Sequence, residues 1–196
     1  LYVGINMVGR EDNPTGHPRR FLQTLRKMRR ALPGVQLAIH AGASEAPNDH
    51  VRDTLLLGAD RIGHGLNLIQ DEDTLLFMRY NHFLVEINLV SNKLLGYEPD
   101  YKDPPFPEYL RIGIPVALST DDRGMWDSNI TDEFFVAVKE FNLSWDEILM
   151  LSRNSLHYSF IDAENKTRLL NTFNQRITDF ESQQKSSTKG TSGKIE

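Results

Sequence analysis

Apolar and polar positions follow two alternating patterns between the first residue and residue 122. Short apolar runs have the length and composition of buried strands, and they end near the following residues: Met7, Ile39, Ile62, Val90 and Leu118. The stretches between these runs carry apolar residues at helical spacing, and Pro33-Gly34 ends the first of them. The polar connection from Arg10 to His17 is long, which suggests a functional loop or a lid. Strands that alternate with helices predict a parallel sheet with right-handed crossovers.

The pattern after residue 122 is helical. Ser144 and Glu147 form a capping box at the start of one predicted helix. The helix before it carries one apolar stripe, made of Phe134, Phe135, Val138 and Phe141. From Gln183 the composition turns to Lys, Ser, Thr and Gly, which is typical of a disordered segment. We therefore expect a folded part over residues 1–182 and a disordered polar tail over residues 183–196.

Five predicted βα units leave two α/β folds open. The chain forms either an open, doubly wound sheet or the C-terminal part of a (β/α)₈ TIM barrel, because five parallel strands cannot close a barrel of eight. A natural chain rarely begins inside a core strand, and Leu1 to Met7 already has a strand pattern. We therefore expect that further sequence lies upstream.

Composition excludes some classes of partner and site. The net charge of −5 gives no electrostatic reason to expect nucleic acid or an anionic membrane surface as a partner. The chain has no run of about 18 apolar residues, so no transmembrane helix is expected. Because the sequence contains no cysteine, it can form neither disulfides nor thiolate metal sites. The compartment is left open, with the cytoplasm slightly favoured.

Ionisable side chains stand where three of the predicted strands end. His40 follows one apolar run, His64 lies between two glycines after the next, and Asp121-Asp122 follows the last. The C-terminal ends of parallel strands meet at one end of a sheet, where the active sites of such folds lie. We therefore predict a mononuclear metal site in which His40 and Asp121 bind zinc, while His64 and Asp122 serve acid–base chemistry and substrate orientation.

Structural roles for the same residues remain open. A single histidine at a strand end is more often a hydrogen-bonded structural residue than a ligand, and Asp121-Asp122 could cap the following turn. Two carboxylates at the end of a buried strand are costly to desolvate, which favours a nearby cation. Glu86 is either paired inside the fold or a support of the site. The remaining histidines are assigned no role: His17, His50, His82 and His157.

Motifs of other enzyme classes are absent from the sequence. It contains no Gly-x-Gly-x-x-Gly or P-loop motif after a strand, and no Gly-x-Ser-x-Gly motif of a serine hydrolase. The zinc signature of cytidine deaminases requires cysteine and is therefore excluded. A zinc catalytic site usually has three protein ligands, whereas only His40 and Asp121 are credible here. This shortfall again indicates that ligands lie upstream.

Four motifs in order along the chain resemble the adenosine deaminase family, in particular its growth-factor-related branch. They are His40-Ala41-Gly42, Arg61 to Gly65, Glu86 to Asn88, and Ser119 to Asp122. Each motif alone is weak, but their order and spacing over about residues 1 to 182 make the resemblance specific. The resemblance implies part of a (β/α)₈ barrel with one zinc ion at its C-terminal mouth. It also implies the hydrolysis of adenosine to inosine and ammonia.

The resemblance also implies roles for single residues. Zinc would be held by His40, by Asp121 and by a His-x-His pair on the first strand, which this sequence lacks. His64 would orient and activate the attacking hydroxide, and Asp122 would contact the attacking water and the N7 side of the purine. The backbone N–H of Gly9 would donate to the purine ring. The N-terminal part of its own barrel is therefore an expected partner, besides a small purine substrate.

Position 43 departs from the family. The family has His-Ala-Gly-Glu, in which the glutamate protonates the purine N1, whereas this chain has Ala43. Alanine cannot donate a proton, and Glu45 would point elsewhere from a tight turn. Loss of a general acid costs about 10²- to 10⁴-fold in rate, so the site is expected to be disabled. Either Ala43 is an engineered change, or the protein is a pseudoenzyme that binds nucleosides without converting them.

The substrate also has alternatives. An adenine nucleotide or an N6-modified adenosine would suit the same chemistry. A nucleotide requires cationic groups beside the site, and Arg10 and Arg123 are the only candidates. Arg123 stands where the family usually has proline, which could change the loop and the specificity without affecting the metal.

Overall fold

The computed structural model describes residues 2–43, 48–98, 100–101 and 105–191. The contacts within the chain divide it into two units, Leu1–Phe160 and Ile161–Glu196. The first unit contains a five-stranded sheet with its helices. The second unit contains the long helix α9 (Ala163–Thr191).

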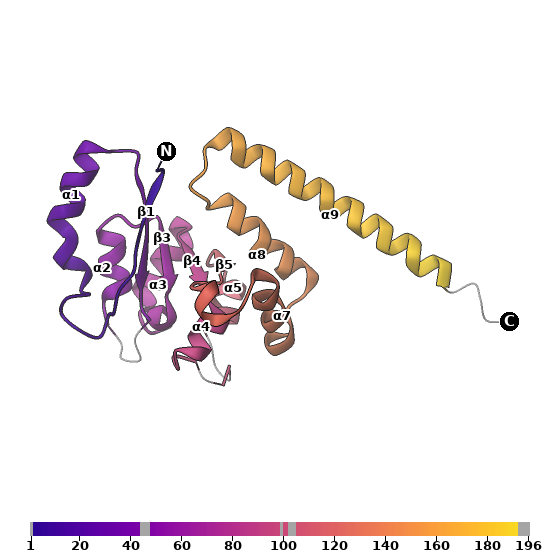
Figure 1. Cartoon of the computed structure of the whole chain (residues 1–196), viewed down its shortest axis with the longest axis horizontal. Coiled ribbons are helices and arrows are strands. Elements are labelled where there is room, and N and C mark those ends of the chain that lie inside the picture. The colour runs from indigo at the N-terminus through magenta and orange to yellow at the C-terminus, as the bar shows by residue number, and fades with distance from the viewer. Residues whose placement is uncertain (1, 44–47, 99, 102–104, 192–196) are drawn as a thin grey trace. The chain divides into compact units, whose positions relative to one another are not determined.

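All five strands are parallel and neighbour one another in chain order (Figure 1). They are β1 (Gly4–Met7), β2 (Gln36–Ala41), β3 (Arg61–His64), β4 (Leu84–Ile87) and β5 (Val116–Leu118). A doubly wound sheet reverses its strand order at a switch point, whereas a barrel keeps one direction throughout. The consecutive order therefore agrees with the second of the two predicted folds, the partial (β/α)₈ barrel. The edges of this sheet are β1 and β5.

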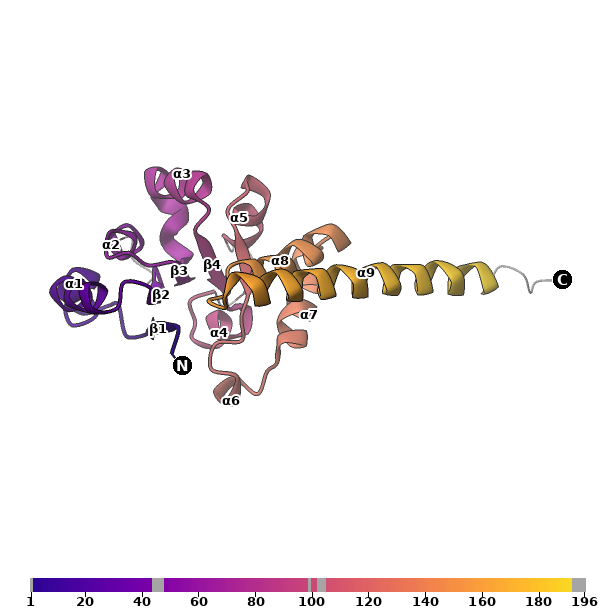
Figure 2. The same ribbon diagram turned by 90° about the horizontal axis from the view of Figure 1, so that it is seen from above.

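Helices that connect the strands lie along one face of the sheet, as Figure 2 shows. They are α1 (Leu22–Ala31), α2 (His50–Leu56), α3 (Glu72–Asn81) and α5 (Phe106–Ile112). Apolar strand residues such as Leu37, Ile62 and Val85 are fully buried in the core. Strands buried on both faces are near-continuous apolar runs, which explains why the sequence reveals them so clearly.

Shorter and later elements complete the first unit. They are η1 (Pro18–Phe21), η2 (Leu66–Gln70), α4 (Leu89–Leu94), α6 (Arg123–Trp126), α7 (Ile130–Phe141) and α8 (Trp145–His157). The capping box predicted at Ser144 and Glu147 is confirmed at the start of α8. None of the helices in the described ranges combines the length and the apolar character that a membrane span requires.

One prediction about local structure is wrong, and a second is confirmed only in part. The strand expected to reach Val90 ends at Ile87, and α4 begins at Leu89, because the carboxylate of Glu133 accepts hydrogen bonds from the N–H groups of Leu89 and Val90. The apolar stripe on α7 marks its buried face only in part. Phe134 and Phe141 pack against the core, whereas Phe135 is 65% exposed and the buried face also carries Glu133, which is fully buried.

The predicted boundary at residue 182 falls within α9, which continues to Thr191. The helix thus extends into the segment where the sequence predicts a polar tail. Residues 192–196 lie outside the described part of the chain. The division into a folded part and a tail stays a prediction.

Candidate metal centre

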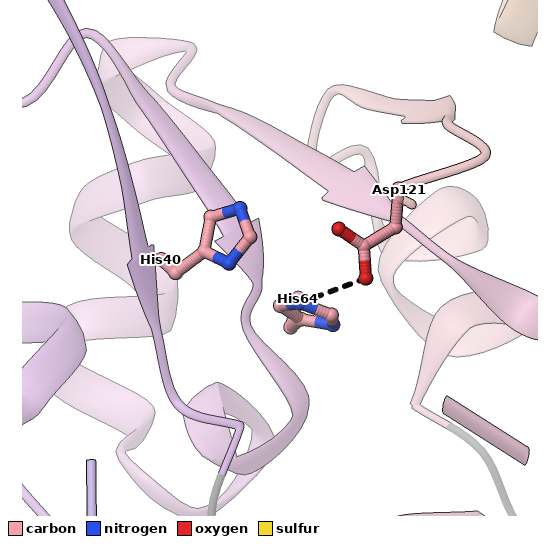
Figure 3. Close-up of side chains that lie close together, drawn as sticks. All are labelled: His40, His64 and Asp121. Carbon is pink, nitrogen blue, oxygen red and sulfur yellow. Dashed lines mark ion pairs between the residues drawn. The ribbon is translucent and has the colours of Figure 1, made fainter. Parts of the chain in front are cut away.

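Three of the predicted side chains meet at the C-terminal ends of the strands. His40 lies on β2, His64 ends β3, and Asp121 follows β5 (Figure 3). One ligand atom from each residue can be chosen so that all three lie within 4.8 Å of one another. His64 Nε2 is 3.9 Å from Asp121 Oδ2, and the rings of His40 and His64 meet edge to face with their centroids 4.8 Å apart. The group therefore offers two imidazoles and a carboxylate to one point.

The backbone around the centre adopts conformations that few residues tolerate. His64 has φ of 67° and Asp121 has φ of 51°, both in the left-handed region. Such residues cluster at functional sites, where the surrounding structure holds them. Gly63 allows the close approach of the first histidine, because a Cβ atom there would lie 2.5 Å from His40 Cδ2.

Asn92 fixes the orientation of His64. The amide oxygen of Asn92 lies 2.8 Å from His64 Nδ1, and the amide nitrogen donates to Glu98 Oε2 at 3.3 Å. Because the amide nitrogen serves Glu98, the amide oxygen accepts the hydrogen bond from Nδ1–H of His64. When the imidazole is neutral, this hydrogen bond keeps its proton on Nδ1, and Nε2 points its lone pair toward Asp121.

The donor set of the centre fits a divalent metal. Asp121 accepts a 2.6 Å hydrogen bond from Ser91 Oγ, and its Oδ2 faces the lone pair of His64 Nε2. A cation between two such acceptors relieves their mutual repulsion. Burial lowers the pKa of His40, with a smaller contribution from His64, so this imidazole is neutral at physiological pH. Neutral imidazole nitrogens and a carboxylate are typical zinc ligands.

Asp122 and Gly9 lie outside the three-residue group. Asp122 is exposed at the N-cap of α6, and its backbone carbonyl accepts from the N–H groups of Met125 and Trp126. Gly9 lines a cavity of about 160 Å³ together with Glu11 and His40. The catalytic role of Asp122 and the substrate contact of Gly9 stay predictions.

Glu11 is a residue of the site that the sequence interpretation missed. Its carboxylate accepts hydrogen bonds from the N–H groups of Gly42 at 2.7 Å and Ala43 at 3.1 Å. It also lies 3.1 Å from Nδ1 of His50, a buried histidine to which the sequence interpretation assigned no role. The signal in the sequence is its place in the long polar loop directly after β1. Glu11 thus joins this loop to the turn that follows His40.

Glutamine in place of Glu11 is expected to destabilise the protein by about 1–3 kcal/mol, because an amide offers one oxygen where the carboxylate serves several donors. Asp12 is the matched control, since it is exposed and pairs with Arg10 at the surface. Urea unfolding of Glu11→Gln and Asp12→Asn measures the difference. Equal stability of the two variants would contradict the role of Glu11.

Two further carboxylates lie near the strand ends. Glu86 pairs with Arg61 at 2.7 Å, which agrees with the first of its two predicted roles. Burial raises the pKa of Glu98 to about 7, against the smaller opposing effect of the hydrogen bond from Asn92. Glu45 lies outside the described residues, so its orientation is not tested.

Stability is expected to depend on the protonation of Glu98. Its pKa is higher in the folded than in the unfolded state, so its favourable contribution is present below about pH 4.5 and is lost as the pH rises to about 7. Glu98→Gln mimics the protonated side chain and should stabilise the protein at pH 8 by about 2 kcal/mol, with little effect at pH 4. Urea unfolding at both pH values measures this. A stability difference that is the same at both would contradict it.

The fold and this centre define a parallel βα protein with a candidate metal site at its strand ends. The sequence matches the family model described as adenosine deaminase over residues 2–176. The chain belongs to the adenosine deaminase family. The predicted family is thereby confirmed, whereas the likeness to its growth-factor-related branch stays a prediction.

Individual relatives agree with this assignment. The chain is 32% identical to N6-methyl-AMP deaminase-L of Xenopus laevis over 171 residues, which cover 86% of this chain and 48% of that protein. It is 32% identical to adenosine deaminase of Clostridium acetobutylicum over 137 residues, which cover 70% of this chain and 41% of that protein. The chain thus spans less than half the length of these two curated relatives.

A solved structure extends the comparison to the fold. Adenine deaminase from Arthrobacter aurescens superposes with a TM-score of 0.82 at 26% identity, and the match covers 90% of this chain and 53% of that one. This similarity agrees with the consecutive order of the parallel strands. The five βα units therefore have the architecture of a partial TIM barrel.

Proposed function

We propose that this chain forms part of a zinc-dependent hydrolase that converts adenosine and water to inosine and ammonia. The observation that carries the proposal is the convergence of His40, His64 and Asp121 within 4.8 Å in a member of the adenosine deaminase family. His40 and Asp121 are the proposed zinc ligands. When bound, zinc lowers the pKa of a water molecule to near neutrality and so supplies a nucleophile.

The residues of this chain position and move protons around that water. His64 Nε2 is the ring nitrogen that would act on that water, because Nδ1 is hydrogen-bonded to Asn92. Asp122 would contact the attacking water and the N7 side of the purine from its exposed place beside Asp121. Gly9 would donate its N–H to the purine ring, and it lines the same cavity as His40. These roles place the purine between the β1 loop and the strand ends.

Ala43 is the reason to expect low activity in this chain. The carboxylate that contacts the turn at this position belongs to Glu11, and it already accepts hydrogen bonds from the backbone N–H groups of Gly42 and Ala43. It is therefore poorly placed to protonate the purine N1. A non-catalytic nucleoside-binding protein is the alternative that Ala43 favours.

A second candidate substrate is an adenine nucleotide such as N6-methyl-AMP. The specific observation in its favour is the similarity to the Xenopus deaminase. Arg10 is already paired with Asp12, which weakens its claim to a phosphate. Arg123 is exposed at the start of α6, directly after Asp122, and is the better candidate for a phosphate contact.

Further strands of a barrel are the proposed partner of this sheet. The edge strands of the sheet are β1 and β5, and Val3 and Ile5 at the β1 edge are 52% and 38% exposed. An exposed edge with apolar side chains favours pairing with another strand. The N-terminal part of the same barrel would cover both edges and supply the remaining metal ligands.

Product analysis of the zinc-loaded protein tests the proposed function. Adenosine should yield inosine with ammonia, whereas N6-methyl-AMP should yield IMP with methylamine, so the released amine distinguishes the two substrates. Activity should disappear when a chelator removes the metal and return with zinc. If zinc and adenosine bind but neither amine is released, even with glutamate at position 43, the nucleoside-binding alternative replaces the deaminase.

A further inference from the structure

The short helix α4 carries residues that contact two side chains of the metal centre, Asp121 and His64. Ser91 and Asn92 of α4 are fully buried, and they contact Asp121 at 2.6 Å and His64 at 2.8 Å. The amide of Asn88, at the N-cap of the same helix, lies 3.2 Å from His64 Nδ1. The position of α4 therefore sets the orientation of both groups.

Among the described residues, the N-terminus of α4 is not capped by the side chain of its own N-cap residue. It spans six residues, and the side chain of its N-cap residue Asn88 makes no capping hydrogen bond within the described part of the chain. The first N–H groups of any helix lack partners within the helix and need acceptors from elsewhere. A helix of little more than one turn is also unstable without tertiary contacts.

Glu133 of α7 supplies those acceptors. Its carboxylate accepts from Leu89 N–H at 2.8 Å and from Val90 N–H at 3.3 Å, across a sequence separation of more than 40 residues. Glu133 is fully buried, and a buried carboxylate is costly unless it is hydrogen-bonded. On the other side of the same turn, the hydroxyl of Tyr101 donates to the carbonyl of Leu89 at 3.0 Å. The first turn of α4 is thus fixed from two neighbouring segments.

We propose that Glu133 is a positioning residue of the metal centre. By fixing the first turn of α4, it fixes Ser91 and Asn92, and through them the carboxylate of Asp121 and the ring of His64. Glu133 itself contacts neither residue of the centre, so its effect is transmitted by the backbone of α4. This inference rests on the proposed zinc site.

Glu133→Gln tests the proposal, with Glu140→Gln, at an exposed position near the C-terminal end of the same helix, as the matched control. Both variants replace a carboxylate of α7 with an isosteric amide, but only the first disturbs α4. Zinc affinity of Glu133→Gln should fall about 10- to 100-fold, as is typical for residues that support metal ligands, while Glu140→Gln matches the parent protein. The ring ¹⁵N resonances of His64 in the metal-free protein should change from the Nδ1–H tautomer to a mixture of tautomers.

The tautomer of His64 separates positioning from mere stability. A loss of folding free energy alone would leave the His64 resonances of the folded protein unchanged. Unchanged resonances and unchanged zinc affinity in Glu133→Gln would overturn the proposal. If the parent protein binds no zinc, the proposed function fails, while the His64 resonances still decide the role of Glu133. If Glu133→Gln does not fold, Glu133→Asp, which keeps the charge on a shorter side chain, is judged by the same two measurements.

Discussion

Replacing Ala43 with glutamate is expected to raise the rate of deamination about 10²- to 10⁴-fold in the zinc-loaded protein. The reason is the missing proton donor, since position 43 lies in the turn that follows β2, the strand that carries His40. The new carboxylate would stand next to that of Glu11, which binds the N–H of Ala43. A neighbouring like charge raises the pKa of a carboxyl group, and a raised pKa suits a proton donor. Ammonia release from adenosine measures the effect.

Ala43→Gln is the control for this prediction. Glutamine has the size and the hydrogen-bonding reach of glutamate, but it cannot supply the proton at neutral pH. A gain in turnover that appears with glutamate and not with glutamine identifies acid catalysis at this position. Equal rates for both variants would show that substrate contact, rather than proton donation, is what alanine lacks. No gain with either variant would count against a deaminase.

Asp121 and Asp122 are adjacent, yet their replacement is expected to have different effects. Asp121→Ala should weaken zinc affinity by more than about a hundredfold, because a direct ligand contributes more than the residues that support it. Asp122→Asn should keep the zinc and, in the Ala43→Glu background, lose most of the turnover, since Asp122 lies outside the three-residue group. Zinc titration followed by the adenosine assay measures both effects. Retention of zinc by Asp121→Ala, or its loss from Asp122→Asn, would contradict the assignment.

The strands and the meeting of His40, His64 and Asp121 could be predicted from the sequence. Buried parallel strands are nearly continuous apolar runs, so their C-terminal ends can be located within a few residues. A parallel sheet then brings those ends together without any knowledge of loops. The consecutive strand order could not be derived in this way, because apolar runs carry no information about which strands are neighbours.

The supporting acids could not be predicted from the pattern. Glu11 and Glu133 bind backbone N–H groups that are 31 and 44 residues away in the sequence. A single acidic residue in a polar loop or a helix has no periodicity that would indicate burial. Glu133 lies on the buried face of α7 beside apolar residues such as Ala137, where the sequence pattern alone would place an apolar side chain. The same contact explains why a helix begins where the sequence predicts continued strand.

The left-handed backbone conformations of His64 and Asp121 lower the free energy of unfolding of the protein. Each such residue costs on the order of 1–3 kcal/mol, and glycine would adopt the same conformation without that cost. Directed evolution of this chain for heat resistance alone would therefore favour replacement of these two residues early. Thermostable variants that keep both side chains would have to gain their stability elsewhere in the protein, so any screen for robustness should be coupled to a screen for metal binding.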